Sequence, residues 1–326
     1  MGEVLLVTGA SGSVGSNVCR LAAERGYRVR ALVRDLGGAS ALQELGVELV
    51  EGDVRDPESL RPAAEGASRI VHAAAQIGGT WSTAAPEDFH AINFLGAVNV
   101  LDAAQAAGVV QTVLILSMTI VDRAYTVTEV SPLVAISPDH SPYNRAKLAA
   151  YYHAMAQAAV GMPITFVLPG AIYGPTPLVE RALVPTSFTG TLVSAARGEL
   201  TEYLPSLMGW VLASEVADVS LAAVERGRIG VRYLATGRAE DVISLPAFCN
   251  RFLEMAGIDR RVAEIDINDV NALAGQYGSM VKYVHTSYPD PPHDPRVTTS
   301  DLGVDPTSLH EGLSMTLDWL RAEGRI

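Results

Sequence analysis

The sequence predicts an α/β fold, a doubly wound parallel sheet joined to a smaller, partly discontinuous C-terminal substrate lobe. Three observations lead to this expectation. The chain has 326 residues, which is enough for one large domain or two lobes with a sizeable core. Short apolar runs alternate with helical stretches through the first part of the chain, as in a parallel sheet with crossover helices. A glycine-rich turn follows the first apolar run directly.

Seven short apolar runs are expected to form the strands. They are Glu3–Thr8, Arg28–Val33, Glu48–Glu51, Arg69–His72, Thr112–Leu116, Ile164–Leu168 and Val231–Ala235. Between the first two, apolar side chains such as Val18 and Leu21 give residues 15–25 a helical spacing. Asp56 and Pro57 are typical of the N-cap and first position of another helix.

A second part of the chain is expected after Pro175, where several prolines interrupt a segment of mixed character. The run at 231–235 has the compact apolar character of a sheet strand, so we expect the chain to return there to the large domain. The expected ranges are 1–175 with 210–237 for the large domain, and 176–209 with 238–326 for the substrate-binding lobe.

The acidic composition argues against a nucleic-acid partner and against an anionic membrane surface. The formal net charge of −12 repels both. No run of about 18 apolar residues occurs, and no signal-peptide pattern precedes the first apolar run, so we expect a cytoplasmic protein. Cys19 and Cys249 form no CxxC pair and have no neighbouring histidine, so we expect no metal site and interpret both as small buried side chains.

The glycine-rich turn from Thr8 to Gly15 predicts where a dinucleotide binds. Gly9 permits a tight turn, Gly12 lets backbone N–H groups approach a pyrophosphate, and Gly15 allows close packing of helix on strand. A glycine-spaced motif alone is weak evidence, but this one lies between a predicted strand and a predicted helix. The large domain is therefore expected to be a Rossmann fold. Its expected cofactor contacts in the turn are Gly9, Ser11, Gly12, Ser13, Val14 and Gly15.

The end of the second predicted strand indicates which cofactor binds. Arg34 occupies the position where an arginine would meet the 2′-phosphate of NADP, so NADP is expected and NAD is less favoured. Asp35 would serve the ribose of NAD if the register shifted by one, and both could form a solvated surface pair. Asp53 follows the third strand and could accept a hydrogen bond from the adenine amino group. Further cofactor contacts are expected at Val54, Ala73, Ala74 and Ala75.

Tyr143 and Lys147 carry the strongest chemical signal in the sequence. Ser141 and Pro142 begin a helix, on which residues four apart share a face. A phenol with a pKa near 10 is a poor acid–base group at neutral pH, but a neighbouring ammonium favours the phenolate. With only two lysines and 11 tyrosines, chance predicts well under one such pair in the chain. The pair predicts proton transfer to a carbonyl oxygen as hydride reaches the carbon.

A hydroxyl at the end of the fifth predicted strand would complete the site. Ligands of open α/β folds bind at this edge of the sheet, and a hydroxyl there could hydrogen-bond a substrate carbonyl. Thr119 is the expected catalytic hydroxyl and Ser117 is the alternative. Either hydroxyl could instead be satisfied by its own backbone.

Together these residues resemble the extended short-chain dehydrogenase/reductases over nearly the whole chain. The family's TGxxGxxG turn matches residues 8–15, and its adenine-contacting aspartate matches Asp53. Its YxxxK pair matches Tyr143 and Lys147, and its catalytic Ser/Thr matches Thr119. The resemblance implies an NAD(P)-dependent enzyme with these residues in its site.

The resemblance implies further site residues and a branch of the family. Asn93 falls where the family has a helix asparagine that supports the active site, and residues 169–175 look like its segment near the nicotinamide. The implied cofactor contacts there are Lys147, Pro169, Gly170 and Ile172. Residues 26–35 look like the dihydroflavonol-reductase and 3β-hydroxysteroid-dehydrogenase-like branch. This branch implies a ketone or aldehyde reductase.

The leading hypothesis is an NADP-dependent oxidoreductase, a carbonyl reductase or alcohol dehydrogenase that transfers hydride between NADPH and a ketone or aldehyde. Largely apolar loop residues favour an apolar or aromatic substrate. The expected substrate contacts are Gln76, Met118, Thr119, Tyr143, Tyr173 and Leu178, with Ile77 and Trp81 as further candidates.

Two alternatives stay open: a nucleotide-sugar epimerase or dehydratase with internally recycled NAD(P), and a noncatalytic, redox-sensing nucleotide binder. The resemblance also suggests a homodimer through the helices that carry Asn93 and Tyr143. The exposed faces of these helices are alanine-rich and polar enough to suit a monomer as well.

Overall fold

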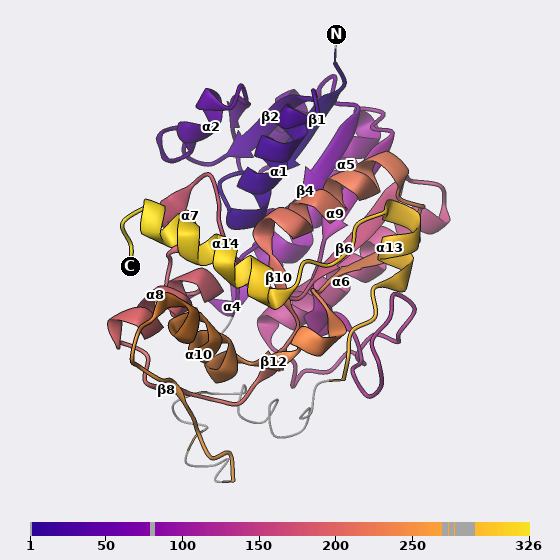
Figure 1. The fold of residues 1–326 in the computed structure, drawn as a ribbon. Helices are drawn as coiled ribbons and strands as arrows, with labels where there is room; N and C mark the ends of the chain where they lie inside the picture. The colour runs from indigo at the N-terminus through magenta and orange to yellow at the C-terminus, as the bar shows by residue number, and fades with distance from the viewer. Residues whose placement is uncertain (1, 79–81, 269–272, 274–276, 278–290) are drawn as a thin grey trace.

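A seven-stranded parallel sheet forms the centre of the molecule (Figure 1). The computed structural model describes the chain except for residues 1, 79–81, 269–272, 274–276 and 278–290. The strand order is β11-β6-β5-β4-β1-β2-β3, and all neighbouring strands are parallel. The strands are β1 (Val4–Thr8), β2 (Arg28–Val33), β3 (Glu48–Glu51), β4 (Arg69–His72), β5 (Gln111–Ile115), β6 (Ile164–Pro169) and β11 (Arg232–Ala235). The prediction of a doubly wound sheet is confirmed, with the strand order reversing between β1 and β4, where such folds bind ligands.

Helices cover both faces of the sheet. On one face pack α1 (Ser13–Glu24), α9 (Ala213–Arg226) and α13 (Arg296–Leu302), and on the other α3 (Pro57–Ala64), α5 (Gly96–Ala106) and α6 (Pro142–Ala159). The alternation of side chains along a strand explains this arrangement, because Leu5 and Val7 join the first layer and Leu6 joins the second. The shorter helices of this part are η1 (Gly37–Ala39), α2 (Ala41–Glu44), α4 (Pro86–Phe89), the π-helical η2 (His90–Leu95) and η3 (Met118–Ile120).

The sheet strands begin and end at, or within one residue of, the predicted positions. Two predicted helix starts are also confirmed. The Asp56 side chain accepts a hydrogen bond from the Glu58 N–H at 3.1 Å, and the Ser141 side chain accepts one from the Asn144 N–H at 3.2 Å. Local patterning suffices here because most of these strands are buried on both faces, although the edge strand β3 is not, and because these caps depend on adjacent residues.

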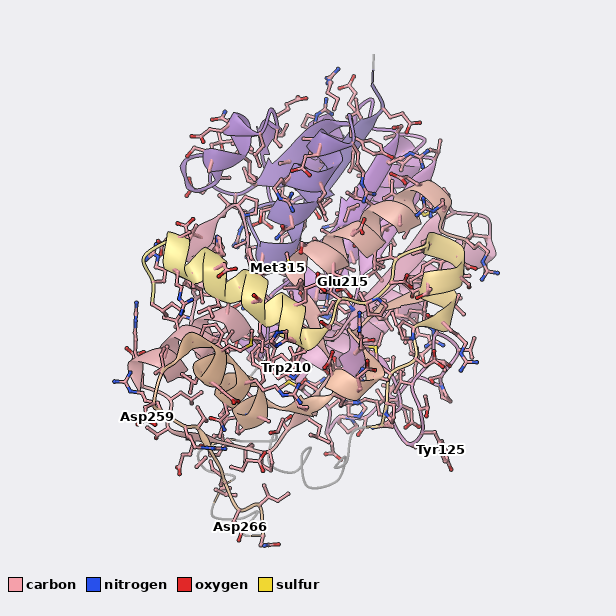
Figure 2. All side chains as sticks on the ribbon, viewed as in Figure 1. Tyr125, Trp210, Glu215, Asp259, Asp266 and Met315 are labelled. Carbon is pink, nitrogen blue, oxygen red and sulfur yellow. The ribbon has the colours of Figure 1, made fainter. Side chains whose placement is uncertain are left out.

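Stacked aromatic rings form the core of the C-terminal lobe. The rings of Trp210 and Phe248 are parallel with centroids 3.6 Å apart, and Tyr173 packs edge-on against Phe248 at 5.1 Å. The lobe's helices are α7 (Val179–Ala182), α8 (Phe188–Arg197), η4 (Ala239–Asp241), α10 (Leu245–Ala256) and α14 (Leu309–Ala322). Three short strand pairs accompany them: β7 (Ala171–Tyr173) with β10 (Trp210–Leu212), β9 (Leu207–Met208) with β12 (Ile243–Ser244), and β8 (Glu202–Tyr203) with β13 (Ala263–Glu264). Trp210 lies between α10 and α14 (Figure 2).

The expected residue ranges of the large domain and the lobe stay a prediction. The structure shows which core each of several boundary residues packs in. Ala171 and Trp210, expected in the large domain, pack within the aromatic core of the lobe. Helix α13, expected in the lobe, instead packs against α9 and β11 at the sheet. The chain therefore crosses between the two cores several times.

The first turns of α1 hold the start of the lobe in place. Ser16 Oγ and Thr176 Oγ1 are 2.6 Å apart, and Asn17 Nδ2 donates to the Pro175 carbonyl at 3.0 Å. Ser16, Asn17 and Thr176 are all buried. This crossing, which we call the α1 anchor, fixes the direction in which the chain enters α7.

Cys19 and Cys249 are free thiols with no exposed surface, so their interpretation as small buried side chains is confirmed. No helix in the described part of the chain combines the length and the apolar character needed to cross a membrane. Within the same residues, no three His, Cys, Asp or Glu side chains gather as a metal-binding group would.

Candidate active site

The glycine-rich turn brings three stretches of backbone into direct contact. Gly9 has a φ of +68°, and a Cβ there would lie 2.4 Å from the backbone nitrogen of Ala74. A Cβ at Gly15 would lie 2.2 Å from the carbonyl oxygen of Gly9. Residues with side chains rarely adopt positive φ, and backbone atoms cannot move aside as a flexible side chain can. Positions 9 and 15 therefore need glycine to let β1, β4 and α1 meet.

The predicted pyrophosphate contacts lie where this turn enters α1. Gly12 is the N-cap, its N–H donates to the Gly9 carbonyl at 2.9 Å, and it brings no side chain to the first N–H groups of the helix. Ser11 precedes it, and Ser13 and Val14 form the start of α1. A helix N-terminus offers unpaired N–H groups and partial positive charge, which suit an anionic group.

Charged side chains gather after β2 and β3, where adenosine contacts were predicted. Asp53 accepts from Arg55 Nη2 at 2.7 Å and from Arg55 Nε at 3.1 Å. This hydrogen bonding lowers the pKa of Asp53, and the nearby charge of Arg34 adds to the effect. Asp35 folds back on its own loop, where its Oδ1 accepts from the Gly37 N–H at 3.0 Å. Arg34 is exposed beside this loop.

Asn93 fixes the chain that follows β4. It lies in the π-helical turn η2, where its Oδ1 accepts from the Gln76 N–H at 2.7 Å and its Nδ2 donates to the Gln76 carbonyl at 3.0 Å. Asn93 is buried, and the small residues 73–75 lead from β4 to this clamp. Asn93 was predicted as catalytic, and its contacts here are those of a positioning residue for the Gln76 backbone.

The other predicted cofactor contacts lie after β3 and around the start of β7. Val54 is buried against the start of α5. Pro169 ends β6, and Ile172 lies in the middle of β7. A Cβ at Gly170 would lie 2.3 Å from the carbonyl oxygen of Gly209, so this position lets the chains before β7 and β10 approach each other.

Tyr143 and Lys147 occupy the first turns of α6. The Tyr143 ring packs edge-on against Phe89, and Gly78 lies against its Cβ. Lys147 Nζ lies 5.9 Å from the centre of the Tyr143 ring and donates to the Ile115 carbonyl at 3.0 Å. Because Lys147 is buried, its pKa falls to about 8. The ammonium is therefore held inside the protein beside the phenol and close to its neutral form.

The hydroxyl that acts on Tyr143 is that of Ser117, the alternative in the sequence-based prediction. Thr119 Oγ1 donates to Ser117 Oγ at 3.0 Å, and Ser117 is near enough to Tyr143 to lower the pKa of the phenol. Burial raises the pKa of Tyr143, while the Ser117 hydrogen bond acts in the opposite direction. The three hydroxyls form a series in which Thr119 supports Ser117 and Ser117 supports Tyr143.

His72 is a buried residue near Lys147 that was predicted from the sequence only as the last residue of a strand. Its Nδ1 lies 2.7 Å from Thr8 Oγ1, and both residues are buried. Burial, followed by the charge of Lys147, lowers the pKa of His72 to about 3. His72 is therefore neutral at physiological pH and adds no second positive charge beside Lys147.

Three of the predicted substrate contacts are packed in the interior. Met118, Tyr173 and Leu178 are each less than 9% exposed and belong to three different apolar clusters. Burial raises the pKa of Tyr173, and a Cβ at Gly312 would lie 2.1 Å from its hydroxyl oxygen. The partly exposed members of the predicted set are Gln76, Thr119 and Tyr143. Ile77 is exposed, and Trp81 lies outside the described residues.

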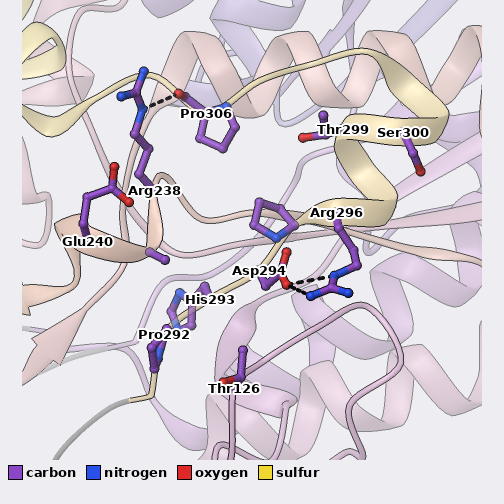
Figure 3. Close-up of a pocket in the computed structure, with 12 residues that line it drawn as sticks. Thr126, Arg238, Glu240, Pro292, His293, Asp294, Arg296, Thr299, Ser300 and Pro306 are labelled. Atoms are coloured by element: carbon purple, nitrogen blue, oxygen red, sulfur yellow. Dashed lines mark hydrogen bonds and ion pairs between the residues drawn. The ribbon is translucent and has the colours of Figure 1, made fainter.

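A separate cavity of about 550 Å³ lies beside the end of β11 (Figure 3). Its charged side chains include Arg238, whose Nε donates to the Pro306 carbonyl at 3.0 Å, and Arg296, whose Nε donates to Asp294 at 2.8 Å. Ser117, Tyr143 and Lys147 do not line it. This cavity is therefore distinct from the hydroxyl series.

The profile of the NAD dependent epimerase/dehydratase family matches residues 5–235. The chain belongs to this family. The match runs from β1 to β11, so it includes both the glycine-rich turn and the Tyr143–Lys147 pair. The resemblance to the extended short-chain dehydrogenase/reductases is confirmed.

Individual relatives align with most of the length of this epimerase/dehydratase family member. Sterol demethylase protein B of Methylococcus capsulatus is 31% identical over 240 residues, which are 71% of this chain and 69% of that protein. A 4-hydroxy-2-methyl-3-oxo-4-farnesyl-3,4-dihydroquinoline-1-oxide ketoreductase of Stigmatella aurantiaca is 29% identical over 279 residues, 82% of this chain and 78% of that protein. The crystal structure of gox2253 superimposes with a TM-score of 0.83 at 25% identity, covering 100% of both chains.

The glycine-rich turn predicts that alanine is tolerated at position 12 and destabilises the protein at position 15. Alanine normally favours a helix over glycine by about 1 kcal/mol, yet Gly15→Ala should lower the free energy of unfolding by about 1–3 kcal/mol because its Cβ meets backbone. Gly12→Ala is the matched control, since its Cβ would meet only one atom, at 3.3 Å. Urea denaturation of both variants measures the difference. Equal stabilities would show that the backbone contact does not constrain the turn.

Lys147 should make the stability of the protein depend on pH. Its pKa in the folded state, about 8, lies below the ordinary value of 10.5. The unfolded chain therefore binds more protons between these pH values, so the contribution of Lys147 to stability rises with pH there and is lost as pH falls through about 8. We expect the free energy of unfolding of the unchanged protein, minus that of Lys147→Met, to increase over this range. A difference independent of pH would contradict the buried location of the ammonium.

Proposed function

We propose that this protein is an NADP-dependent carbonyl reductase or alcohol dehydrogenase that acts on an apolar ketone, aldehyde or alcohol. The observation that carries the proposal is the hydroxyl series from Thr119 through Ser117 to Tyr143, with Lys147 inside the protein beside it. This set stands at the carboxyl ends of parallel strands, where open α/β folds bind ligands. It offers one hydrogen-bonded phenol that can give a proton to, or take one from, a single oxygen atom.

The backbone around the glycine-rich turn fits a dinucleotide. Positions 9 and 15 leave no room for Cβ atoms, and Gly12 opens the N-terminus of α1 to an anion. When bound, NADPH would supply hydride from its nicotinamide. The turn would hold the pyrophosphate, Arg34 the 2′-phosphate and Lys147 the nicotinamide ribose.

Each side chain of the site would have its own role in the reduction of a carbonyl group. The Ser117 and Tyr143 hydroxyls would hold the substrate carbonyl oxygen, and Tyr143 Oη would donate its proton as that oxygen gains negative charge. Burial raises the pKa of Tyr143 and keeps the phenol protonated, which suits a proton donor. The Ser117 hydrogen bond and the charge of Lys147 would stabilise the phenolate that is left.

An apolar substrate is supported by the surroundings and by the relatives. The Tyr143 ring packs against Phe89 and the glycine-containing loop after β4, so the site is bordered by uncharged surface. The names of two relatives, a sterol demethylase protein and a ketoreductase of a farnesylated quinoline oxide, refer to lipophilic compounds. We therefore place lipophilic ketones and their alcohols first among candidate substrates.

Variants of the hydroxyl series test the proton-transfer role. With a panel of apolar ketones and NADPH, Tyr143→Phe should lower kcat by about 10²–10⁴-fold and leave cofactor affinity unchanged. Ser117→Ala should cost more activity than Thr119→Val, because Ser117 acts on Tyr143 directly and Thr119 acts through Ser117. Activity that survives Tyr143→Phe would overturn the role of Tyr143 as proton donor. Binding of NADPH by the unchanged protein with no reduction of any ketone would instead favour a noncatalytic nucleotide binder.

Identification of the nucleotide tests the cofactor. Protein stripped of nucleotide should bind NADPH more tightly than NADH, and Arg34→Gln should reduce that preference about tenfold through loss of a charge-assisted contact to phosphate. Isothermal titration of both nucleotides gives the two dissociation constants. NAD that stays bound through purification would instead favour an epimerase or dehydratase that recycles its cofactor within one turnover.

A further inference from the structure

Two arginines from distant parts of the chain lie at the loop after β2. Arg34 directly follows β2, and Arg181 belongs to α7 of the lobe. A Cβ at Gly38 would lie 3.8 Å from Arg181 Nη2 and 2.7 Å from Asp35 Oδ2. The guanidinium of Arg181 therefore lies over the loop whose residues face the adenosine ribose in this fold.

Neither side chain has a close polar partner. Among the residues that the structure describes, the guanidinium groups of Arg34 and Arg181 make no hydrogen bond and no ion pair. Other arginines of this acidic chain are paired with carboxylates, as in Arg20–Glu24, Arg25–Asp218, Arg55–Asp53, Arg69–Glu3 and Arg228–Asp301. Asp35 lies on the same loop and the charge of Arg34 acts on Asp53, but neither carboxylate forms an ion pair with these two guanidinium groups, which leaves them able to bind an anion.

The position of Arg181 is built into the fold. The α1 anchor fixes the chain just before α7, and Leu178 packs into the same apolar cluster as α1 and β2. The neighbouring acid, Glu180, forms an ion pair with Arg325 near the C-terminus. Asp35, the nearest acid on the loop, has one carboxylate oxygen bonded to the Gly37 N–H.

We propose that Arg181 is a second specificity residue for NADP, which reaches from the lobe to the 2′-phosphate opposite Arg34. This inference rests on the proposed use of NADP. A phosphate dianion suits two guanidinium groups because their planar forks donate paired hydrogen bonds to its oxygens. The 2′-phosphate would then join the sheet domain to α7, a link that NAD lacks.

Binding of nucleotide fragments tests this without catalysis. Isothermal titration compares 2′,5′-ADP with 5′-AMP, which differ only in the 2′-phosphate. Arg181→Gln should weaken binding of 2′,5′-ADP about tenfold and change binding of 5′-AMP less than about twofold. Arg181→Lys keeps the charge without the planar fork, so its loss should be intermediate. Arg197→Gln, an exposed arginine on α8, is the matched control and should alter neither ligand.

The outcomes separate this inference from the proposed function. If Arg34→Gln reduces the preference for 2′,5′-ADP and Arg181→Gln does not, the role of Arg181 is overturned and the NADP proposal stands. If Arg181→Gln weakens both ligands equally, Arg181 acts on the fold and not on the phosphate, which also overturns its role. If the unchanged protein does not distinguish the ligands, the choice of NADP fails together with the inference.

Discussion

The contact of bare backbone among Gly9, Gly15 and Ala74 is the constraint on which the candidate site depends. It lies at the ends of β1 and β4, where the strand order of the sheet reverses. It also constrains the angle at which α1 leaves the sheet. The same helix then carries the α1 anchor, which directs the chain into the lobe. The positions of the predicted pyrophosphate site and of the segment that enters the lobe therefore both depend on one turn of eight residues, 8–15.

The chemistry depends on keeping one cation inside the protein at low cost. Lys147 is almost fully buried, and an isolated ammonium in such surroundings is expensive. Its partner is the Ile115 carbonyl, and its neighbour His72 is held neutral by burial and hydrogen-bonded to Thr8. The result is a lysine whose charge responds to small changes in its surroundings, such as the arrival of a polar ligand.

The parts of the fold and site that were predictable are those with local or periodic signals. The strands follow from apolar runs, the turn from glycine spacing, and the Tyr143–Lys147 pair from helical spacing and the scarcity of lysine. The hydrogen bond between Thr119 and Ser117 was not predictable, because it depends on how the short helix η3 orients two hydroxyls that are two residues apart. The sequence alone also does not show whether an apolar side chain lines a pocket or packs in the core.

Several contacts of the predicted residues depend on tertiary structure, which local patterns do not describe. Tyr173 has the composition of a pocket residue, but its ring belongs to the stack of Trp210 and Phe248. Asn93 binds Gln76 through a π-helical turn, which no propensity anticipates. Arg181 reaches a loop far from it in sequence, so only the folded chain brings the two together.

The α1 anchor also makes the conformation of the lobe and that of the glycine-rich turn depend on each other. Before Thr176, an insertion in the crossing segment would move Pro175 away from Asn17 and disturb the first turns of α1. After it, the chain returns to the sheet, where α9 packs against α1 and β11 pairs with β6. A rearrangement of the lobe would therefore be transmitted through these contacts to the helix that begins at the glycine-rich turn.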